Sequence, residues 1–279
     1  MKVTTFVQKR KELRRLLTGA NAHIAPGAAD VLTARLVAQM GFAAVYLSGS
    51  LQHALRGYAD VNALTMSEMA QTAHNVANEI AVPSIADGET GFGIGINVVR
   101  MVREYERAGV AAIHLEDSTV PKRPARLGFE SPTVSRAEFL DKIKAALDAR
   151  TDETLVIIAR SELRGNDDEK IERLGNALEL GADAFWAGGF SSAQVEKVCR
   201  QLKKPAVAVL PKGMTAERFG SLGVKLAVVP GALAIAGLMA QRALLEDMKT
   251  SGSWSDWLER QPAFKAASDY YNGQGLADL

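Results

Sequence analysis

Acidic side chains follow several short apolar runs of the sequence, at the positions where buried strands would end. In SIADGETGFG, residues 84–93, the run ends with Asp87 and Glu89 among three glycines, and in HLED the next run ends with Glu116. Asp60 lies in the long segment after the preceding run. Neighbouring buried carboxylates repel each other unless a cation lies between them, and oxygen ligands suit a hard cation. We therefore predict that these four acids hold Mg²⁺, which Mn²⁺ could replace; the alternative is that they cap helices or form surface ion pairs.

Two further runs end in groups that could bind an anion. YLSGS presents Ser48, Gly49 and Ser50, whose backbone N–H groups could surround a carboxylate. IIAR ends with Arg160, a cation that could bind a carboxylate through two hydrogen bonds. Together with a divalent metal, these groups predict a small, multiply anionic substrate. A 2-oxo or 2-hydroxy acid fits, because its carboxylate and adjacent oxygen would chelate the metal.

The runs that end in these groups belong to a regular series of eight, each followed by an amphipathic stretch. They lack polar alternation, which is typical of strands buried on both faces of a parallel sheet. Eight such units in 279 residues predict a (β/α)₈ TIM barrel, in which active groups lie at the carboxyl ends of the strands. The predicted strands cover residues 22–27, 43–49, 83–89, 111–117, 154–162, 183–189, 205–211 and 224–231.

The chain after residue 250 departs from this series. Its aromatic side chains, among them Trp254, Trp257 and Tyr271, need burial somewhere. We therefore predict a catalytic barrel over residues 1–250 and an extension over residues 251–279. The extension would pack on the barrel or, as we favour, on another subunit.

The overall composition argues against several classes of protein. The 33 basic and 32 acidic residues leave a net charge of +1, so no nucleic-acid partner is expected. The single cysteine, Cys199, excludes an intrachain disulfide and a cysteine-rich zinc site, and it lies in a helical pattern. No apolar run reaches the length of a membrane span, so no membrane contact is expected and the sequence predicts a cytoplasmic protein.

YLSGS, DGETGFG, HLED and IIAR, in this order at predicted strand ends, resemble the isocitrate lyase/phosphoenolpyruvate mutase superfamily over roughly residues 20–245. The resemblance implies a barrel whose last helix is exchanged between subunits, in a homotetramer built as a dimer of dimers. It also implies Mg²⁺-dependent cleavage or formation of C–C or C–P bonds. The resemblance implies that Asp87 coordinates the metal directly. Asp60, Glu89 and Glu116 would hold metal-bound waters. The substrate carboxylate would be bound by Ser48, Gly49, Ser50 and Arg160.

Two further residues indicate the branch of the superfamily. Tyr46 before LSG and His114 in HLED resemble the C–C lyases that act on acids similar to 2-methylisocitrate. Those lyases carry a K-K-C-G-H loop after strand four, but residues 118–134 of this chain contain neither cysteine nor histidine. The resemblance makes Tyr46, Asp60, Lys122 and Arg160 the catalytic candidates and adds His114 to the substrate-binding ones.

The segment 118–134 is the predicted lid of the site. It carries Lys122, Arg123 and Arg126 between prolines, so cations could close over an anionic substrate. VPK at Lys122 resembles the loop of the phosphonopyruvate-processing branch.

These observations leave three functions to compare. The leading hypothesis is a Mg²⁺-dependent lyase that cleaves or forms a C–C bond of a small 2-hydroxy or 2-oxo acid through a metal-stabilised enolate. It covers activities similar to 2-methylisocitrate lyase and to oxaloacetate decarboxylase. The alternatives are a phosphonopyruvate mutase or hydrolase and a non-catalytic barrel that binds oxo acids.

Overall fold

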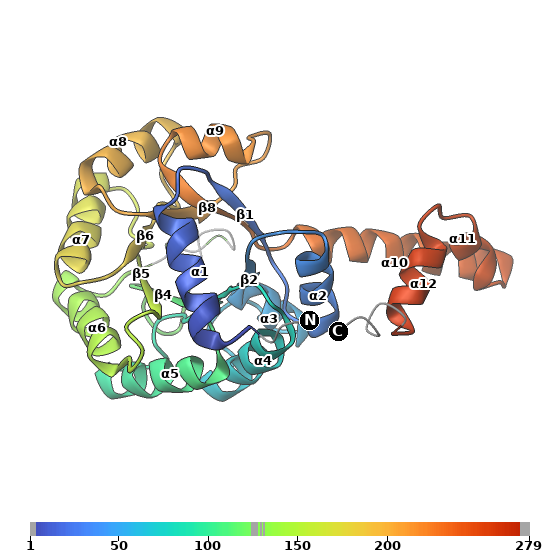
Figure 1. Ribbon diagram of the computed structural model, residues 1–279, viewed down its shortest axis with the longest axis horizontal. Helices are drawn as coiled ribbons and strands as arrows, with labels where there is room; N and C mark the ends of the chain where they lie inside the picture. Colours follow the sequence, from blue (N-terminus) through green and yellow to red (C-terminus); the bar gives the residue numbers. More distant parts are fainter. Residues whose placement is uncertain (1–3, 124–127, 129, 131, 274–279) are drawn as a thin grey trace. The chain divides into compact units, whose positions relative to one another are not determined.

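Eight parallel strands form the centre of the protein in the computed structural model, which describes residues 4–123, 128, 130 and 132–273. Their hydrogen-bonded order is β1-β8-β7-β6-β5-β4-β3-β2, and a bridge between Gly27 and Tyr46 brings β1 and β2 together. The predicted (β/α)₈ barrel is confirmed, with all eight strands inside the predicted ranges (Figure 1). The strands are β1 His23–Pro26, β2 Val45–Leu47, β3 Ser84–Asp87, β4 Ala112–Glu116, β5 Val156–Arg160, β6 Ala184–Trp186, β7 Ala206–Val209 and β8 Val224–Val229.

Amphipathic helices connect the strands and cover the outside of the barrel (Figure 1). In α5, for example, Val98, Met101 and Tyr105 are buried at helical spacing, and Gly109 ends the helix with φ of 92°. The helices between strands are α2 Val31–Gln39, α3 Gly49–Leu55, α4 Met66–Glu79, α5 Gly95–Ala108, α6 Arg136–Ala149, α7 Asp167–Glu179, α8 Ser192–Leu202 and α9 Ala216–Ser221.

The first helix, α1 (Phe6–Thr18), closes the amino-terminal end of the barrel. Its buried Leu13, Leu16 and Leu17 join the apolar cluster inside the barrel. Arg10, also buried, donates through Nε to the carbonyl of Val110, just before β4 (3.0 Å). The opposite end, where the strands reach their carboxyl ends, therefore holds the acids singled out above.

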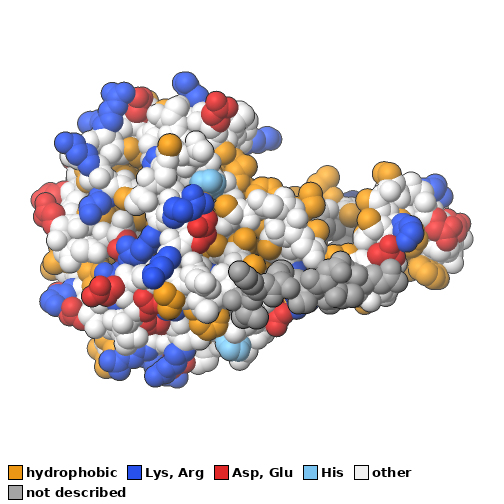
Figure 2. All heavy atoms as spheres, in the orientation of Figure 1, with side chains coloured by type: hydrophobic (Ala, Val, Ile, Leu, Met, Phe, Trp, Pro, Cys, Tyr) orange, Lys and Arg blue, Asp and Glu red, His pale blue; other side chains and the backbone are white. Residues whose placement is uncertain are grey.

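The residues after β8 form a second compact unit. The first unit covers residues 4–231, and the second contains α10 (Ala232–Ser251), α11 (Ser255–Glu259) and α12 (Phe264–Tyr271). The boundary expected at residue 250 thus falls at the end of α10, which belongs to the C-terminal unit. Within the described residues none of these three helices has a buried side chain, and Figure 2 shows hydrophobic side chains exposed along them.

No helix in the described part of the chain is both long and apolar enough to cross a bilayer.

Candidate active site at the carboxyl end of the barrel

A cavity of about 470 Å³ opens at the carboxyl ends of the strands. It is lined by residues at the ends of β2, β3 and β5, by residues of the loops after β2, β4 and β5, and by others in or after β6, β7 and β8. The sequence-predicted residues among its lining are Tyr46, Ser48, Ser50, Asp60, Asp87, Lys122 and Arg160. The remaining predicted residues, Gly49, Glu89, His114 and Glu116, are buried directly behind this surface.

The end of β3 folds so that its two acids face the site. Asp87 accepts hydrogen bonds from the backbone N–H of Gly49 (3.0 Å) and of Glu89 (2.9 Å). Glu89 has φ of 49°, a left-handed conformation that non-glycine residues seldom adopt and that is concentrated at functional sites. A β-carbon on Gly49 would lie 2.7 Å from Asp87 Oδ2 and still closer to Glu89, so this backbone approach requires glycine.

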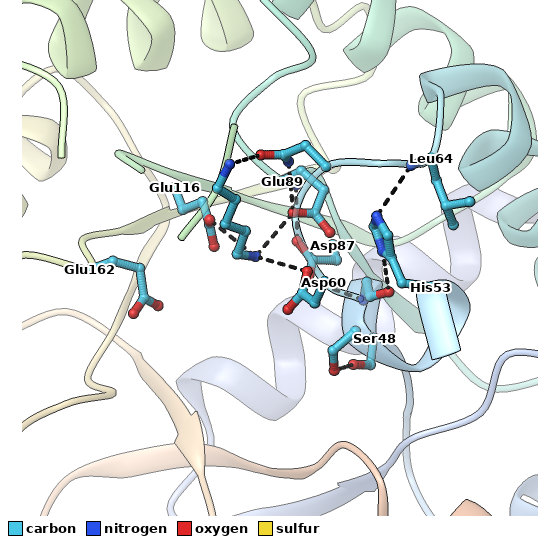
Figure 3. A network of polar contacts seen from close by, with 12 residues as sticks. Ser48, His53, Asp60, Leu64, Asp87, Glu89, Glu116 and Glu162 are labelled. Carbon is cyan, nitrogen blue, oxygen red and sulfur yellow. Dashed lines mark hydrogen bonds and ion pairs between the residues drawn. The ribbon is translucent and has the colours of Figure 1, made fainter. Parts of the chain in front are cut away.

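Lys122 lies at the centre of the acidic cluster. Its ammonium is 3.0 Å from Glu89, 3.1 Å from Glu116 and 3.6 Å from Asp60. Figure 3 shows these three acids pointing toward one another. Burial alone would lower the pKa of Lys122, but the carboxylates of Glu116 and Glu89 raise it well above its usual range. Lys122 is therefore a fixed, charged member of the site in this conformation.

The charge balance of the cluster fits a further cation. Oε1 of Glu89 and both carboxylate oxygens of Glu116 accept no hydrogen bond from the described residues, although Lys122 and Arg160 lie close to Glu116. Burial raises the pKa of Glu89 to about 8, and the negative charge of the nearby Asp87 adds to this shift. A divalent cation with oxygen ligands would relieve both features.

Histidine does not contribute to this donor set in the conformation observed. Atoms of His53, Asp60 and Glu89 lie within 4.8 Å of one another, close enough to share an ion. However, Nδ1 of His53 is 2.8 Å from the carbonyl of Gly49, and Nε2 accepts from the N–H of Leu64 (3.2 Å). Since both ring nitrogens are engaged, the candidate ligands that remain among the described residues are carboxylate oxygens.

Arg160 is held in place from two sides. Its Nε and Nη2 contact Oε1 of Glu162 at 2.7 and 2.6 Å, and its guanidinium lies over the ring of Trp186 at 4.8 Å. Nη2 also lies 3.3 Å from Glu116. The arginine is thus a fixed cation at the cavity wall, with part of its donor set already used by Glu162.

Tyr46 and His114 form a buried pair beside Asp87. The Tyr46 hydroxyl is 2.8 Å from Nε2 of His114, and Nδ1 of His114 is 3.6 Å from Asp87. Burial lowers the pKa of His114 to about 4 and raises that of Tyr46 well above its usual range, so both are neutral near pH 7. Only Tyr46 of the two lines the cavity, where its hydroxyl could donate to a substrate oxygen.

The YLSGS segment is placed differently from the expected carboxylate nest. The N–H of Gly49 donates to Asp87 rather than into the cavity, and Ser48 caps α3 by accepting from the N–H of Leu51 (3.4 Å). Besides Tyr46, this segment contributes Ser48 and Ser50 to the cavity lining, and their hydroxyls are 2.9 Å apart.

The predicted lid is described in part. Its two ends meet through a bridge between Ser118 and Thr133, and Lys122 reaches the acidic cluster. Arg126 lies outside the described residues.

Three residues to which the sequence assigned no role in the site organise it. Asn62 accepts from the N–H of Lys122 (2.9 Å) and donates to Glu89 (3.1 Å). Asp117 accepts from Ser161 (2.6 Å) and from Arg173 (3.1 Å), so it joins the ends of β4 and β5. Glu162 could have been found, because residues two apart on an extended strand point to the same side as Arg160. Asn62 offered no comparable signal in the sequence.

The chain is similar to known proteins over most of its length. The family model described as Phosphoenolpyruvate phosphomutase matches residues 13–249. A 2,3-dimethylmalate lyase of Eubacterium barkeri is 44% identical over 179 residues, which are 63% of this chain and 61% of that protein. A 2-methylisocitrate lyase of Aeropyrum pernix is 33% identical over 256 residues, 89% of this chain and 82% of that protein.

Comparison with solved structures indicates the same family. The crystal structure of phosphoenolpyruvate phosphomutase from Streptomyces platensis subsp. rosaceus superposes with a TM-score of 0.88 at 29% identity, covering 96% of this chain and 97% of that one. The names of the two curated relatives agree with the carbon–carbon lyase activity that the sequence predicted. The chain therefore belongs to the phosphoenolpyruvate phosphomutase family, within the isocitrate lyase/phosphoenolpyruvate mutase superfamily that its motifs resemble.

Proposed function

We propose that this enzyme is a Mg²⁺-dependent lyase that cleaves or forms a C–C bond of a small 2-hydroxy or 2-oxo acid. The observation that carries the proposal is the convergence of Asp60, Asp87, Glu89 and Glu116 at one cavity wall beside the fixed cation Arg160. The lyase names of the two curated relatives support the C–C rather than the C–P branch.

The reaction requires one proton transfer at each end of the broken bond. The 2-hydroxyl loses its proton, and its O–H electron pair becomes part of the new C=O bond. The C2–C3 pair moves onto C3, where the adjacent carboxylate delocalises it until a proton adds there. A bound Mg²⁺ would supply positive charge next to the 2-oxygen.

The residues of this chain would bind and orient the acid. Arg160 would hold the carboxylate next to the reacting oxygen, since Glu162 and Trp186 fix its guanidinium. Tyr46 would donate a hydrogen bond to the 2-oxygen, and Asp60, which also lines the cavity, would accept the hydroxyl proton. Lys122 would exclude water and balance the charge of the acids.

A substrate panel tests this proposal. The purified enzyme is incubated with Mg²⁺ and a set of 2-hydroxy and 2-oxo acids, and release of pyruvate or glyoxylate is measured with and without EDTA. We expect product from at least one acid and its loss with EDTA. Phosphate release from phosphonopyruvate without C–C cleavage would instead favour the C–P branch. Mg²⁺-dependent binding of acids without turnover of any would indicate the non-catalytic barrel.

We further propose that the enzyme assembles through its C-terminal unit, as a homotetramer in which α10 packs on a second copy. Ile235 and Met239 lie one turn apart on α10 and are 60% and 69% exposed. On the barrel unit, Leu32 and Leu36 of α2 and Met40, which directly follows the helix, form another exposed apolar row. Two such surfaces on one chain support burial between subunits.

A further inference from the structure

A buried lysine that the proposed reaction does not use lies behind the cavity wall. Lys170 on α7 is 3% exposed and is not among the residues that line the cavity. Moving an ammonium out of water is costly unless other groups replace the water. Burial lowers the pKa of Lys170, while the carboxylates of Glu162 and Asp117 favour its charged form. The contacts of Lys170 therefore identify what this buried cation stabilises.

Both contacts of Lys170 are with the loop between β6 and α8. Its ammonium donates to the carbonyl of Gly188 (2.7 Å) and lies 4.6 Å from the centre of the Phe190 ring. Gly189, between these two residues, has φ of 81°, and a β-carbon there would lie 2.8 Å from the ammonium. Among the described residues no carboxylate forms an ion pair with Lys170. The lysine thus holds the loop rather than an acid.

The same loop supports Arg160 through Trp186. Gly188, Gly189 and Phe190 line the cavity. A β-carbon on Gly188 would collide with Nε1 of Trp186, so the loop backbone lies directly against the edge of the indole. The guanidinium of Arg160 lies over this ring at 4.8 Å. Two consecutive glycines lose much conformational entropy when they are ordered, so the loop needs a contact that fixes it.

We propose that Lys170 is a positioning residue, which keeps the β6–α8 loop against Trp186 and thereby keeps Arg160 oriented toward the substrate carboxylate. This inference rests on the proposed lyase function, in which Arg160 binds that carboxylate. Glu162 also holds Arg160. Loss of Lys170 should therefore weaken carboxylate binding without abolishing it.

The test compares two buried lysines. Lys170→Met removes the ammonium and keeps an unbranched side chain, and an apolar group in place of a buried charge is compatible with folding. Lys142→Met is the matched control, because Lys142 is 4% exposed, lies on α6 and does not line the cavity. Lys170→Arg retains a cation that can donate to the Gly188 carbonyl. Urea unfolding checks that each variant is folded.

Calorimetry first measures the affinity for Mg²⁺ and then the affinity of the Mg²⁺-loaded enzyme for oxalate, which offers a carboxylate to Arg160. We expect Lys170→Met to weaken oxalate about tenfold, because the cation that binds it is less well oriented. The affinity for Mg²⁺ should stay within about twofold, since Lys170 contacts none of the four acids at the proposed metal site. Lys170→Arg should bind oxalate more tightly than Lys170→Met does, and Lys142→Met should change neither affinity.

A second measurement needs neither metal nor turnover. Trp186 is 3% exposed and becomes the only tryptophan when Trp254→Phe and Trp257→Phe are introduced. In this background Lys170→Met should raise acrylamide quenching of the Trp186 fluorescence about twofold, because the loop no longer stays against the indole. Lys142→Met should leave the quenching unchanged.

Three results would overturn the inference and leave the proposed function standing. They are unchanged oxalate affinity in Lys170→Met, an equal loss of Mg²⁺ affinity in that variant, and Trp186 quenching that is the same in Lys170→Met and Lys142→Met. A lower free energy of unfolding alone, with oxalate affinity and quenching unchanged, would likewise show that Lys170 only stabilises the fold. If the unmodified enzyme shows no Mg²⁺-dependent binding of oxalate, the proposed function fails, and the inference fails with it.

Discussion

Single residues of the active site are held by charges that compensate one another. Four buried carboxylates share two cations, Lys122 and Arg160, and the pKa values of the acids differ accordingly. Burial by itself would raise the pKa of Asp87, but His114, which is protonated at low pH, and the permanent cations Lys122 and Arg160 hold it well below its usual range. Burial and Asp87 raise the pKa of Glu89. Asp87 stays ionised and is thus the acid best suited to contact a metal directly, while Glu89 is more easily protonated.

Substitution of these two acids should therefore have unequal effects on metal binding. Asp87→Asn should abolish Mg²⁺ binding measured by calorimetry, because the ionised carboxylate beside Gly49 is lost. Glu89→Gln should weaken binding by about 10- to 100-fold, as expected for a group that acts through water. Equal losses in the two variants would contradict the assignment of Asp87 as the direct ligand.

Cys199 should react slowly with alkylating reagents near neutral pH. Burial raises the pKa of its thiol to about 11, so the thiolate that reacts is rare at pH 7. We expect the rate of iodoacetamide labelling to rise about tenfold per pH unit between pH 7 and 10. Cys199→Ser should retain activity, since the residue lies on α8 and does not line the cavity. Rapid labelling at pH 7 that substrate prevents would place the thiol in the site instead.

At the scale of elements, the two ends of the barrel have separate tasks. Helix α1 fills the amino-terminal end with leucines, while loops after the strands carry the chemistry at the carboxyl end. Asp117 and Arg173 link the two strands that carry Glu116 and Arg160, and Arg173 also donates to the carbonyl of Val134 at the far end of the predicted lid (2.7 Å). The buried Arg173 therefore connects the end of the predicted lid to the ends of β4 and β5.

A substitution that creates a cavity at the amino-terminal end of the barrel should lower the free energy of unfolding without changing substrate affinity. Leu16 is 1% exposed, so Leu16→Ala should reduce the free energy of unfolding by about 2–5 kcal/mol. Urea unfolding measures this loss, and the KM of the folded fraction should stay within twofold. A raised KM at full folding would show that α1 also shapes the site. Lys11→Ala, an exposed change on the same helix, is the matched control.

At the scale of the whole molecule, the C-terminal unit has apolar surface that a lone chain leaves exposed. Met239→Glu should therefore lower the molar mass measured by light scattering after gel filtration, because a charge would enter the proposed subunit contact. Gln241→Glu adds the same charge about 200° away around α10 and should leave the mass unchanged. A monomer in the unmodified protein, or equal masses for both variants, would contradict the assembly.

The sequence by itself determined the barrel, the strand positions and the family. Each of these depends on local patterns, namely buried runs without polar alternation and motifs of four to seven residues at their ends. The acids Asp87, Glu89 and Glu116 could be assigned to one mouth because strand ends of a parallel barrel converge.

Only the tertiary structure decided how the groups contact one another. The insertion of Lys122 among the carboxylates depends on a loop conformation fixed by Asn62, and the use of the Gly49 N–H by Asp87 depends on the close approach of two strand ends. The cavity itself, lined by Asp60 and Arg160 together with Trp186 and Pro230, forms only when segments far apart in the chain meet. Contacts of this kind have no periodic signature, because they join residues far apart in the chain whose side-chain directions the fold alone sets.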